Sequence, residues 1–368
     1  MQKTIITTFD QFQDWALENW RPIMALDWET DSLSYLEMNP MGFSLANDTA
    51  VAYVNLLNNE SLSILKRLRG LILDSMDLLI CHNSCFDLKC LKKFCNCEPK
   101  NIFCSLVGAQ LINENLPSYS LKYLTEHWLN VPPEQIKKWE EVKDSINSND
   151  YIDYAMNDAV WAYQLFELES KELKKQNLEY LAYNIEFPFQ FVLRDLEING
   201  IAVDRKQLNP AREQIWQLME SYQIQMCEEA EIDYWYDADL SGNKWLRFGV
   251  NFNSSDQLIP IIEKMGFEIT ERSKKEKKKS LCKKTKLRLK SQCKFVDLLY
   301  RYGKLEKLYS SFLEPCEDFI DSDGRIRPSY HMVRTGRLAC SEPNLQQLPN
   351  PKREKLDFNY RKIFIPGE

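Results

Sequence analysis

Short continuous runs of apolar residues alternate with amphipathic stretches along the first half of the chain. The continuous runs predict buried strands over residues 24–29, 42–46, 50–54 and 78–81. Apolar residues at three- and four-residue spacing predict helices over residues 10–20, 61–74, 82–91, 102–112, 119–129 and 151–175. A polar stretch from 131 to 149 separates the last two helices. Strands that alternate with helices in this way predict a mixed α/β domain.

After residue 177 the pattern becomes mostly helical. Helices are predicted over residues 186–199, 206–230, 253–266 and 295–319. A short extended piece is predicted at 201–204, and further extended segments follow the turn at 321–324. Residues 228–246 are acidic and rich in Trp and Tyr, and they match neither pattern. The second half is therefore predicted to be mostly α-helical, with extended segments at its end.

The composition is that of a globular protein with several domains. The 368 residues, 44% of them hydrophobic, suffice for two or three domains with their own cores. The first residues show no signal-peptide pattern and no apolar run is long enough to span a bilayer, so we expect a soluble, cytoplasmic protein. Six of the eleven cysteines lie between residues 81 and 104 without paired Cys-x-x-Cys spacing. We expect reduced, buried cysteines there, with a zinc site as the alternative.

Charge is unevenly distributed along the chain. The whole chain has a net charge of −7, but residues 1–170 hold 13 Lys and Arg against 24 Asp and Glu, a net of −11. The remaining residues hold 34 against 30, a net of +4. An acidic first half suits metal binding, and a basic second half suits a polyanion. Solvated charged faces are the plainer alternative.

Acidic side chains stand at the ends of several predicted elements. Asp27 and Glu29 end the strand at 24–29, and side chains two residues apart on a strand point to the same face. Asp87 lies in the first turn of the helix after the strand at 78–81, and Asp158 lies on the helix at 151–175. Carboxylates held together repel each other unless a cation lies between them, and Mg²⁺ prefers such oxygen ligands. A pair of solvated acids at a strand end is the alternative for Asp27 and Glu29.

Three segments carry these acids: Asp27-x-Glu29, Asn83-x-x-Phe86-Asp87 and Tyr154-x-x-x-Asp158. They resemble, in order and spacing, the three exonuclease motifs of the DEDD superfamily in its tyrosine-containing branch. The string from Glu29 to Leu33 is similar to the proofreading domain of bacterial, Klenow-type family A DNA polymerases. The resemblance covers roughly residues 20–175 and implies an α/β exonuclease domain with an RNase H-like mixed sheet and helices.

The resemblance implies a 3′–5′ exonuclease that uses two Mg²⁺ ions, for which Mn²⁺ can substitute. Phosphodiester hydrolysis adds negative charge to an anionic phosphate, so a pair of cations held by carboxylates suits the reaction. By resemblance, Asp27 bridges both ions, Glu29 and Asp158 complete the nucleophile-side ion, and Asp87 holds the other. Tyr154 orients the attacking water. The resemblance also implies that Leu33, Asn83 and Phe86 contact the DNA strand, with Leu33 wedged against the terminal base.

The second half resembles the polymerase domain of the same family. Residues 186–204 are similar to the start of that domain, and residues 252–258 to part of its thumb. The segment Thr335-Gly336-Arg337-Leu338, followed by Pro343-Asn344-Leu345-Gln346, resembles the motif that contacts the primer–template minor groove. This resemblance implies a mostly α-helical thumb and a partial α+β palm. It implies DNA contacts through Lys304, Lys307, Arg337, Asn344 and Gln346.

The sequence also departs from that family. Residues 228–246 look like an insertion, and the basic run at 272–290 lacks the family's usual string, although its charge suits phosphate contact. The chain stops at Glu368, before the palm carboxylates and the fingers. We therefore expect domains at 1–177 (exonuclease), 178–320 (thumb) and 321–368 (start of the palm), in a split or truncated polymerase.

On this hypothesis a second polypeptide supplies the missing palm and fingers, and this chain alone does not polymerise. The expected partners are a single-stranded DNA 3′ end, a primer–template duplex and that second chain, in a bacterial or phage-infected cell and in association with the nucleoid. Two alternatives remain open. One is a structural DNA-binding subunit that completes a two-chain polymerase. The other is a stand-alone RNA-trimming exonuclease of the same superfamily, against which the motif at 335–349 argues.

Overall fold

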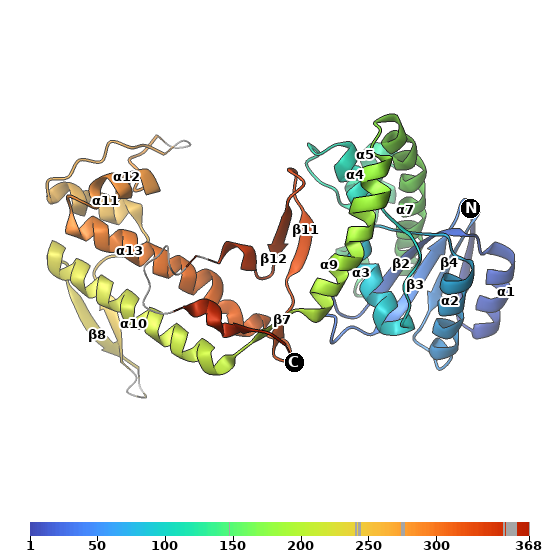
Figure 1. The fold of residues 1–368 in the computed structure, drawn as a ribbon, viewed down its shortest axis with the longest axis horizontal. Coiled ribbons are helices and arrows are strands. Elements are labelled where there is room, and N and C mark those ends of the chain that lie inside the picture. Colours follow the sequence, from blue (N-terminus) through green and yellow to red (C-terminus); the bar gives the residue numbers. More distant parts are fainter. Residues whose placement is uncertain are drawn as a thin grey trace. The chain divides into compact units, whose positions relative to one another are not determined.

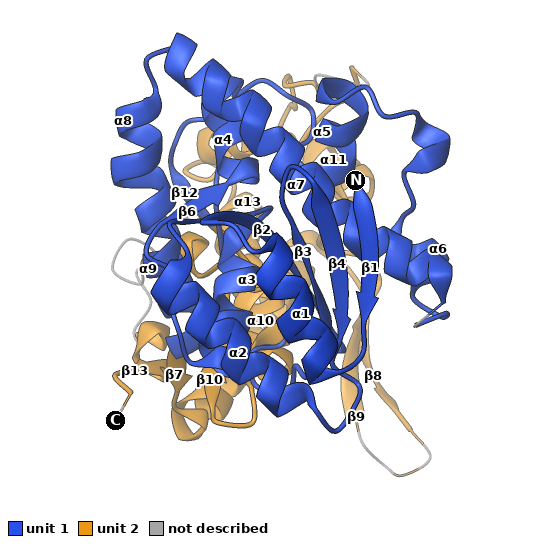
Figure 2. Cartoon of the chain, turned by 90° about the vertical axis from the view of Figure 1, so that its right-hand side faces the viewer, with its two compact units in different colours: residues 1–200, 329–339 blue, residues 201–328, 340–368 orange. Residues whose placement is uncertain are grey.

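The structure is a computed structural model that describes residues 1–146, 148–239, 241, 244–273, 277–348, 350 and 359–367. The chain divides into two compact units (Figures 1 and 2). The first unit contains residues 1–200 and 329–339, and the second contains residues 201–328 and 340–368. The first unit thus continues to Gly200, beyond the domain end expected at residue 177.

A six-stranded mixed sheet forms the centre of the first unit. Its strand order is β1-β4-β3-β2-β5-β6. The antiparallel pairs are β4/β3 and β3/β2, and the other neighbours are parallel. The strands are β1 (Gln2–Ile6), β2 (Ile23–Thr30), β3 (Pro40–Ala46), β4 (Ala50–Asn55), β5 (Leu78–Cys81) and β6 (Ile102–Cys104).

Helices surround this sheet. The α-helices of the first unit are α1 (Phe9–Asn19), α2 (Ser61–Ser75), α3 (Ser84–Cys90), α4 (Ser105–Ile112), α5 (Leu121–Trp128), α6 (Trp139–Val142), α7 (Asn149–Lys175), α8 (Glu179–Leu181) and α9 (Phe187–Asn199). Short π and 3-10 turns are η1 (Leu91–Cys95), η2 (Pro133–Gln135) and η3 (Ala182–Glu186). The long helix α7 packs against β2, β3, β4 and β5, while α9 packs against α3 and thereby joins the first unit.

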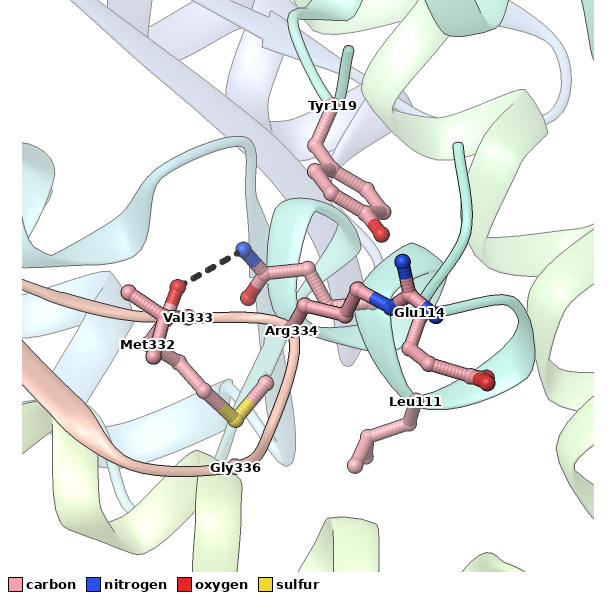
Figure 3. A pocket seen from close by; sticks show the side chains of 8 residues that line it. Leu111, Glu114, Tyr119, Met332, Val333, Arg334 and Gly336 are labelled. Carbon is pink, nitrogen blue, oxygen red and sulfur yellow. Dashed lines mark hydrogen bonds between the residues drawn. The ribbon is translucent and has the colours of Figure 1, made fainter. Parts of the chain in front are cut away.

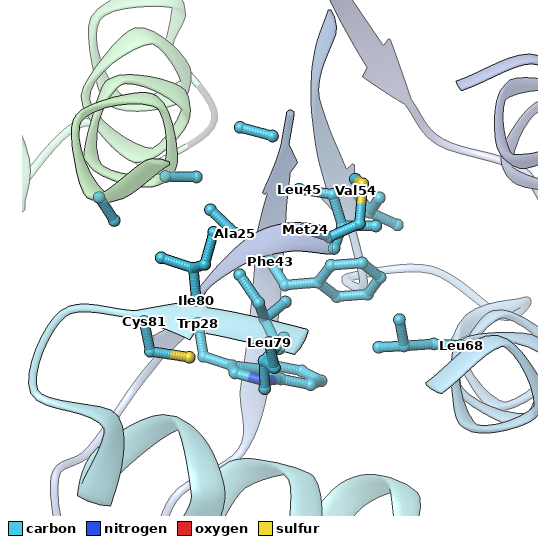
Figure 4. Close-up of a cluster of buried hydrophobic side chains, with 14 of the residues drawn as sticks. Met24, Ala25, Trp28, Phe43, Leu45, Val54, Leu68, Leu79, Ile80 and Cys81 are labelled. Atoms are coloured by element: carbon cyan, nitrogen blue, oxygen red, sulfur yellow. The ribbon is translucent and has the colours of Figure 1, made fainter. Parts of the chain in front are cut away.

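One layer of the core of the first unit lies on the opposite side of the sheet from α7. Met24, Trp28 and Phe43 project there, and the rings of Trp28 and Phe43 lie 5.1 Å apart (Figure 4). Phe43 also contacts Phe12 of α1 edge-on at 5.9 Å. Because Met24 and Trp28 occupy one face of β2, the alternate residues Asp27 and Glu29 must face the other side.

The second unit is mostly helical. Its α-helices are α10 (Arg205–Ala230), α11 (Ser255–Lys264), α12 (Lys283–Leu289) and α13 (Lys294–Leu308), and α10 packs against α13. The turns are η4 (Tyr309–Leu313), η5 (Pro315–Phe319), η6 (Leu345–Gln347) and η7 (Tyr360–Ile363). A small antiparallel sheet has the order β10-β7-β13, and β8 pairs with β9 in a hairpin. These strands are β7 (Ile201–Val203), β8 (Tyr234–Ala238), β9 (Lys244–Phe248), β10 (Arg325–Ile326) and β13 (Phe364–Ile365).

One further hairpin, formed by β11 (Ser329–Met332) and β12 (Leu338–Ser341), begins in the first unit. The backbone N–H of Tyr330 donates to Glu197 Oε1 of α9 at 2.7 Å. Glu197 is buried and also pairs with Lys89 of α3 at 2.8 Å. This hydrogen-bonded pair therefore attaches β11 to the helices of the first unit.

Most elements lie where the sequence pattern predicts them, but the strand β1 and the helix α12 were not predicted, and two further segments also differ. Ile102–Cys104 was predicted as the start of a helix but forms the edge strand β6, because it pairs in parallel with β5. Residues 228–246, which matched no pattern, include β8 and the first residues of β9, and the side chains of this hairpin are largely exposed. All eleven cysteines are free, and all but Cys282 are buried. In the part of the chain that the structure describes, no helix is long and apolar enough to cross a membrane.

Candidate active site

Asp27 and Glu29 lie at the end of β2, on the face toward α7. The pairing of β2 with β5 ends at Ala25 and Ile80, so the last residues of β2 pair only with β3. Two parallel strands that diverge at their carboxyl ends leave an opening between them. This opening gives the two carboxylates access to side chains from other elements.

A glycine on the neighbouring strand makes room beside Glu29. Gly42 of β3 is the register partner of Glu29. A Cβ at Gly42 would overlap the Tyr53 hydroxyl, because that ring lies directly against the glycine. Tyr53 in turn contacts Tyr151 of α7 edge-on at 6.1 Å. Tyr53 and Tyr151 therefore both lie near Glu29.

Asp87 reaches the same region from α3. Asn83, just before this helix, has the left-handed backbone conformation (φ 58°) that turns the chain from β5 into α3. Asp87 then lies in the first turn, fully buried. Its Oδ1 accepts a hydrogen bond from the backbone N–H of Trp28 at 3.3 Å. Asp87 is thus held beside Trp28, the residue between Asp27 and Glu29 on β2.

Tyr154 and Asp158 come from α7, one helical turn apart. Ser148 caps this helix by accepting a hydrogen bond from the Tyr151 backbone N–H at 3.2 Å. Asp158 is buried, which raises its pKa, and the Tyr154 hydroxyl lies near its carboxylate and opposes that rise. The spacing predicted from the sequence therefore does place the two side chains together on one helix face.

Lys122 of α5 is a fifth charged group in this site, and no sequence pattern indicated it. Its Nζ forms an ion pair with Asp158 Oδ1. The same Nζ lies 4.0 Å from the centre of the Tyr154 ring and 4.9 Å from that of Trp161. No motif spacing marks this lysine, because it lies 36 residues before its partner.

The acids strongly affect one another's ionisation. Burial raises the pKa of Glu29 to about 8 and that of Asp87 to about 8, and the charge of Asp158 adds to the effect on Glu29. Burial and then the charge of Glu29 raise the pKa of Asp27 well above its usual range. Lys122 opposes this trend at Asp27, Glu29 and Asp158. The structure therefore brings all four predicted acids into one electrostatically coupled cluster.

The donor set suits a divalent cation, since four buried carboxylates with raised pKa values lack enough positive charge to balance them. The carboxylates do not yet form a closed ligand cage. Among the described residues, no three His, Cys, Asp or Glu side chains are arranged to hold a metal ion. The cluster therefore fits metal ions by its chemistry and needs side-chain adjustment to bind them.

The predicted strand-binding residues lie in the loop after β2 and at the start of α3. Leu33, in the loop after β2, is 80% exposed, which suits contact with a ligand rather than a core role. Asn83 is exposed at the start of α3, whereas Phe86 is half-buried against the core of the first unit.

In the second unit, Lys304 and Lys307 line a cavity of about 500 Å³ with Lys283, Lys286 and Tyr300. The Lys304 ammonium lies 4.6 Å from the centre of the Tyr300 ring. Four lysines around one cavity form a cationic surface that we call the lysine pocket. Burial lowers the pKa of Lys286, which shows that its ammonium group is partly desolvated.

Arg337 is exposed at the turn of the β11/β12 hairpin, where Gly336 has the left-handed conformation (φ 70°). Beside this turn, a cavity of about 180 Å³ lies between the hairpin and the α4 side of the first unit (Figure 3). There Gln110 Nε2 donates to the carbonyl oxygen of Met332 at 3.2 Å. Asn344 and Gln346 belong to the second unit, where Asn344 is half-buried and Gln346 exposed.

Two protein families match the chain. The family described as 3′-5′ exonuclease matches residues 4–174. The family described as DNA polymerase family A matches residues 240–368. The first match contains the whole acidic cluster, and the second contains the lysine pocket and the segment from Arg337 to Gln346.

Individual relatives agree with these matches. DNA polymerase I of Borreliella burgdorferi is 26% identical over 356 residues, which are 93% of this chain and 37% of the relative. The DNA polymerase of Bacillus phage SP01 is 30% identical over 234 residues, 54% of this chain and 25% of the relative. This chain thus spans about a quarter to a little over a third of the length of these curated relatives.

Among solved structures, the fold is similar to the POL domain of Pol1 from M. smegmatis in complex with DNA primer-template and dNTP. The TM-score is 0.76 at 16% identity, and the match covers 99% of this chain and 59% of that one.

Proposed function

We propose that the chain removes nucleotides from single-stranded DNA 3′ ends. The chain belongs to DNA polymerase family A and carries the family's 3′–5′ exonuclease domain. The observation that supports this proposal is the cluster of Asp27, Glu29, Asp87 and Asp158 with Tyr154 beside it. Such a cluster is costly to bury without cations and is what phosphodiester hydrolysis requires.

In this proposal the four carboxylates hold two Mg²⁺ ions, which Mn²⁺ can replace. When bound, such ions supply an activated water and stabilise the leaving oxygen. Asp27, Glu29, Asp87 and Asp158 are the residues that would hold these ions. The Trp28 N–H holds Asp87 in place for this role.

Tyr154 orients the attacking water in the proposed reaction. Burial and the nearby charge of Asp158 raise the pKa of Tyr154, so its hydroxyl keeps its proton at neutral pH. A protonated phenol beside Asp158 has lone pairs that can accept a hydrogen bond from water. Leu33 packs against the terminal base, and Asn83 and Phe86 position the strand.

The second unit and the hairpin grip a primer–template duplex in this proposal. Lys304 and Lys307 suit contacts to phosphates, because four ammonium groups gather around the lysine pocket and attract anions. Arg337, Asn344 and Gln346 suit contacts to acceptors in the minor groove. The second polypeptide with the fingers and the rest of the palm, and primer extension with it, stay predictions of the sequence pattern.

The exonuclease proposal is tested with a labelled single-stranded oligonucleotide and Mg²⁺. The double variant Asp27→Ala, Glu29→Ala is expected to lose several orders of magnitude in rate. Asp14→Ala, an exposed acid on α1, is the matched control and should degrade DNA like the unaltered protein. Degradation by the double variant at the unaltered rate would show that the proposal is wrong. An RNA oligonucleotide cleaved faster than DNA would favour the RNA-trimming alternative.

A further inference from the structure

Lys122 contacts two of the groups on which the proposed exonuclease reaction depends. It is the second residue of α5, and that helix begins after Ser120, whose Oγ accepts a hydrogen bond from the Tyr123 backbone N–H at 3.4 Å. From this fixed position the ammonium pairs with Asp158 and lies over the Tyr154 ring. The Lys122 side chain is 23% exposed and that of Asp158 is 9% exposed, so water screens their attraction only weakly.

The three side chains around this ammonium all come from α7. Tyr154, Asp158 and Trp161 are spaced by four and three residues and therefore share one helix face. An ammonium over aromatic faces gains cation–π attraction, which is stronger for desolvated groups. One cation thus restrains both the carboxylate and the phenol ring.

We propose that Lys122 is a positioning residue of the exonuclease site, which holds Tyr154 and Asp158 in place until metal ions bind. The inference rests on the proposed exonuclease function. In the absence of metal, the ammonium balances part of the charge of the acidic cluster and fixes the Tyr154 ring. When a metal ion binds Asp158, it must share or displace that contact.

This role has two consequences of opposite sign. Removing the ammonium takes a positive charge away from the metal-binding cluster, so divalent cations should bind more tightly. It also frees the Tyr154 ring, so catalysis should become slower even at saturating metal. A lysine that only stabilised the fold would change neither property in a variant that folds.

The test compares Lys122→Met with the unaltered chain. Lys137→Met is the matched control. Lys137 also pairs with an aspartate of α7, at 2.6 Å, but this aspartate, Asp150, is exposed. Mn²⁺ binding without DNA is measured by titration calorimetry, and kcat and KM are measured on a single-stranded oligonucleotide at saturating Mg²⁺.

For Lys122→Met we expect the Mn²⁺ dissociation constant to fall roughly threefold to tenfold. We expect kcat to fall about tenfold to a hundredfold with little change in KM. Lys122→Arg should restore part of kcat, and Lys137→Met should change neither value. Lys122→Gln replaces the methionine variant if the latter does not fold.

Unchanged or weaker Mn²⁺ binding in a folded Lys122→Met variant would overturn the inference, and so would an unchanged kcat. The Asp27→Ala, Glu29→Ala variant separates the two proposals. If it is inactive while Lys122→Met behaves like the unaltered chain, only the role of Lys122 is wrong. If it is active, the exonuclease function itself is wrong.

Discussion

The backbone N–H of Trp28 donates to Asp87 Oδ1 at 3.3 Å, which links the strand of the first motif to the helix of the second. This contact is available because β2 stops pairing with β5 at Ala25. Asp87 therefore has two roles, as acceptor for a strand N–H and as a carboxylate of the site.

These two roles can be separated by Asp87→Asn. The amide oxygen still accepts from Trp28, but one charge of a repelling cluster is removed. We expect this variant to melt at a higher temperature than the unaltered chain in EDTA, and to lose at least about a hundredfold in exonuclease rate with Mg²⁺. Asp87→Ala leaves the N–H without a partner and should not gain stability. Retention of full activity by Asp87→Asn would contradict the assignment of Asp87 as a metal ligand.

The close approach of Gly42 and Tyr53 gives a second prediction. A Cβ at Gly42 would overlap the Tyr53 hydroxyl and lie too close to the Val54 carbonyl oxygen, which is backbone and cannot move away freely. Gly42→Ala should therefore lower the free energy of unfolding by about 1–3 kcal/mol and displace the ring beside Glu29. The control is Gly70→Ala in α2, where the nearest atom lies 4.0 Å away. This control should raise stability by up to about 1 kcal/mol. Chemical denaturation measures both, and equal effects would contradict the prediction.

The site acids were predictable because each motif is local in sequence. Side chains two residues apart on a strand, or four apart on a helix, share a face. The pairing of Asp27 with Glu29 and of Tyr154 with Asp158 therefore follows from spacing alone. Lys122 was not predictable in this way, because its contact with Asp158 depends on how α5 packs against α7. Ile102–Cys104 was misread since three apolar residues directly before a helix continue its pattern. The hairpin of β8 and β9 leaves most of its side chains exposed, with Phe248 half-buried against the core of the second unit, so its strands show no apolar alternation.

Glu169 on α7 provides a prediction about pH. It is fully buried, neither of its oxygens has a hydrogen-bond partner among the described residues, and a Cβ at Gly108 would overlap its Oε2. Burial raises the pKa of Glu169 well above its ordinary value of 4.5, so the folded chain keeps this proton and the unfolded chain releases it. Folding then takes up a proton, and the contribution of Glu169 to stability falls as the pH rises above 4.5.

Glu169→Gln removes this titration without changing the size of the side chain. We expect the variant to be more stable than the unaltered chain by about 1–3 kcal/mol at pH 8, with a smaller difference near pH 5. Glu167→Gln, two residues earlier on the same helix, is the control. Denaturation curves across this pH range measure the difference, and a difference that does not grow with pH would contradict the prediction.

The lysine pocket gives the last prediction, because it gathers four cations around one cavity. Lys279 pairs with Glu263 at 2.5 Å and Arg288 with Glu271 at 2.9 Å, so part of the charge between 272 and 290 is already balanced by acids. Lys283 and Lys286 of the same run line the pocket with Lys304 and Lys307, which brings four ammonium groups around one cavity. Phosphate contact should therefore depend on the pocket more than on the run.

Changing these four pocket lysines to Met should weaken binding to duplex DNA. The slope of log K against log salt should become shallower by about 0.9 for each phosphate that the variant no longer neutralises. Lys294→Met is the control, since Lys294 pairs with Glu229 at 2.8 Å and lies outside the pocket. Fluorescence anisotropy at several salt concentrations measures both slopes. An unchanged slope in the fourfold variant would show that the pocket is only a solvated cationic surface, and the DNA contacts of the second unit would then have to be sought at Asn344 and Gln346.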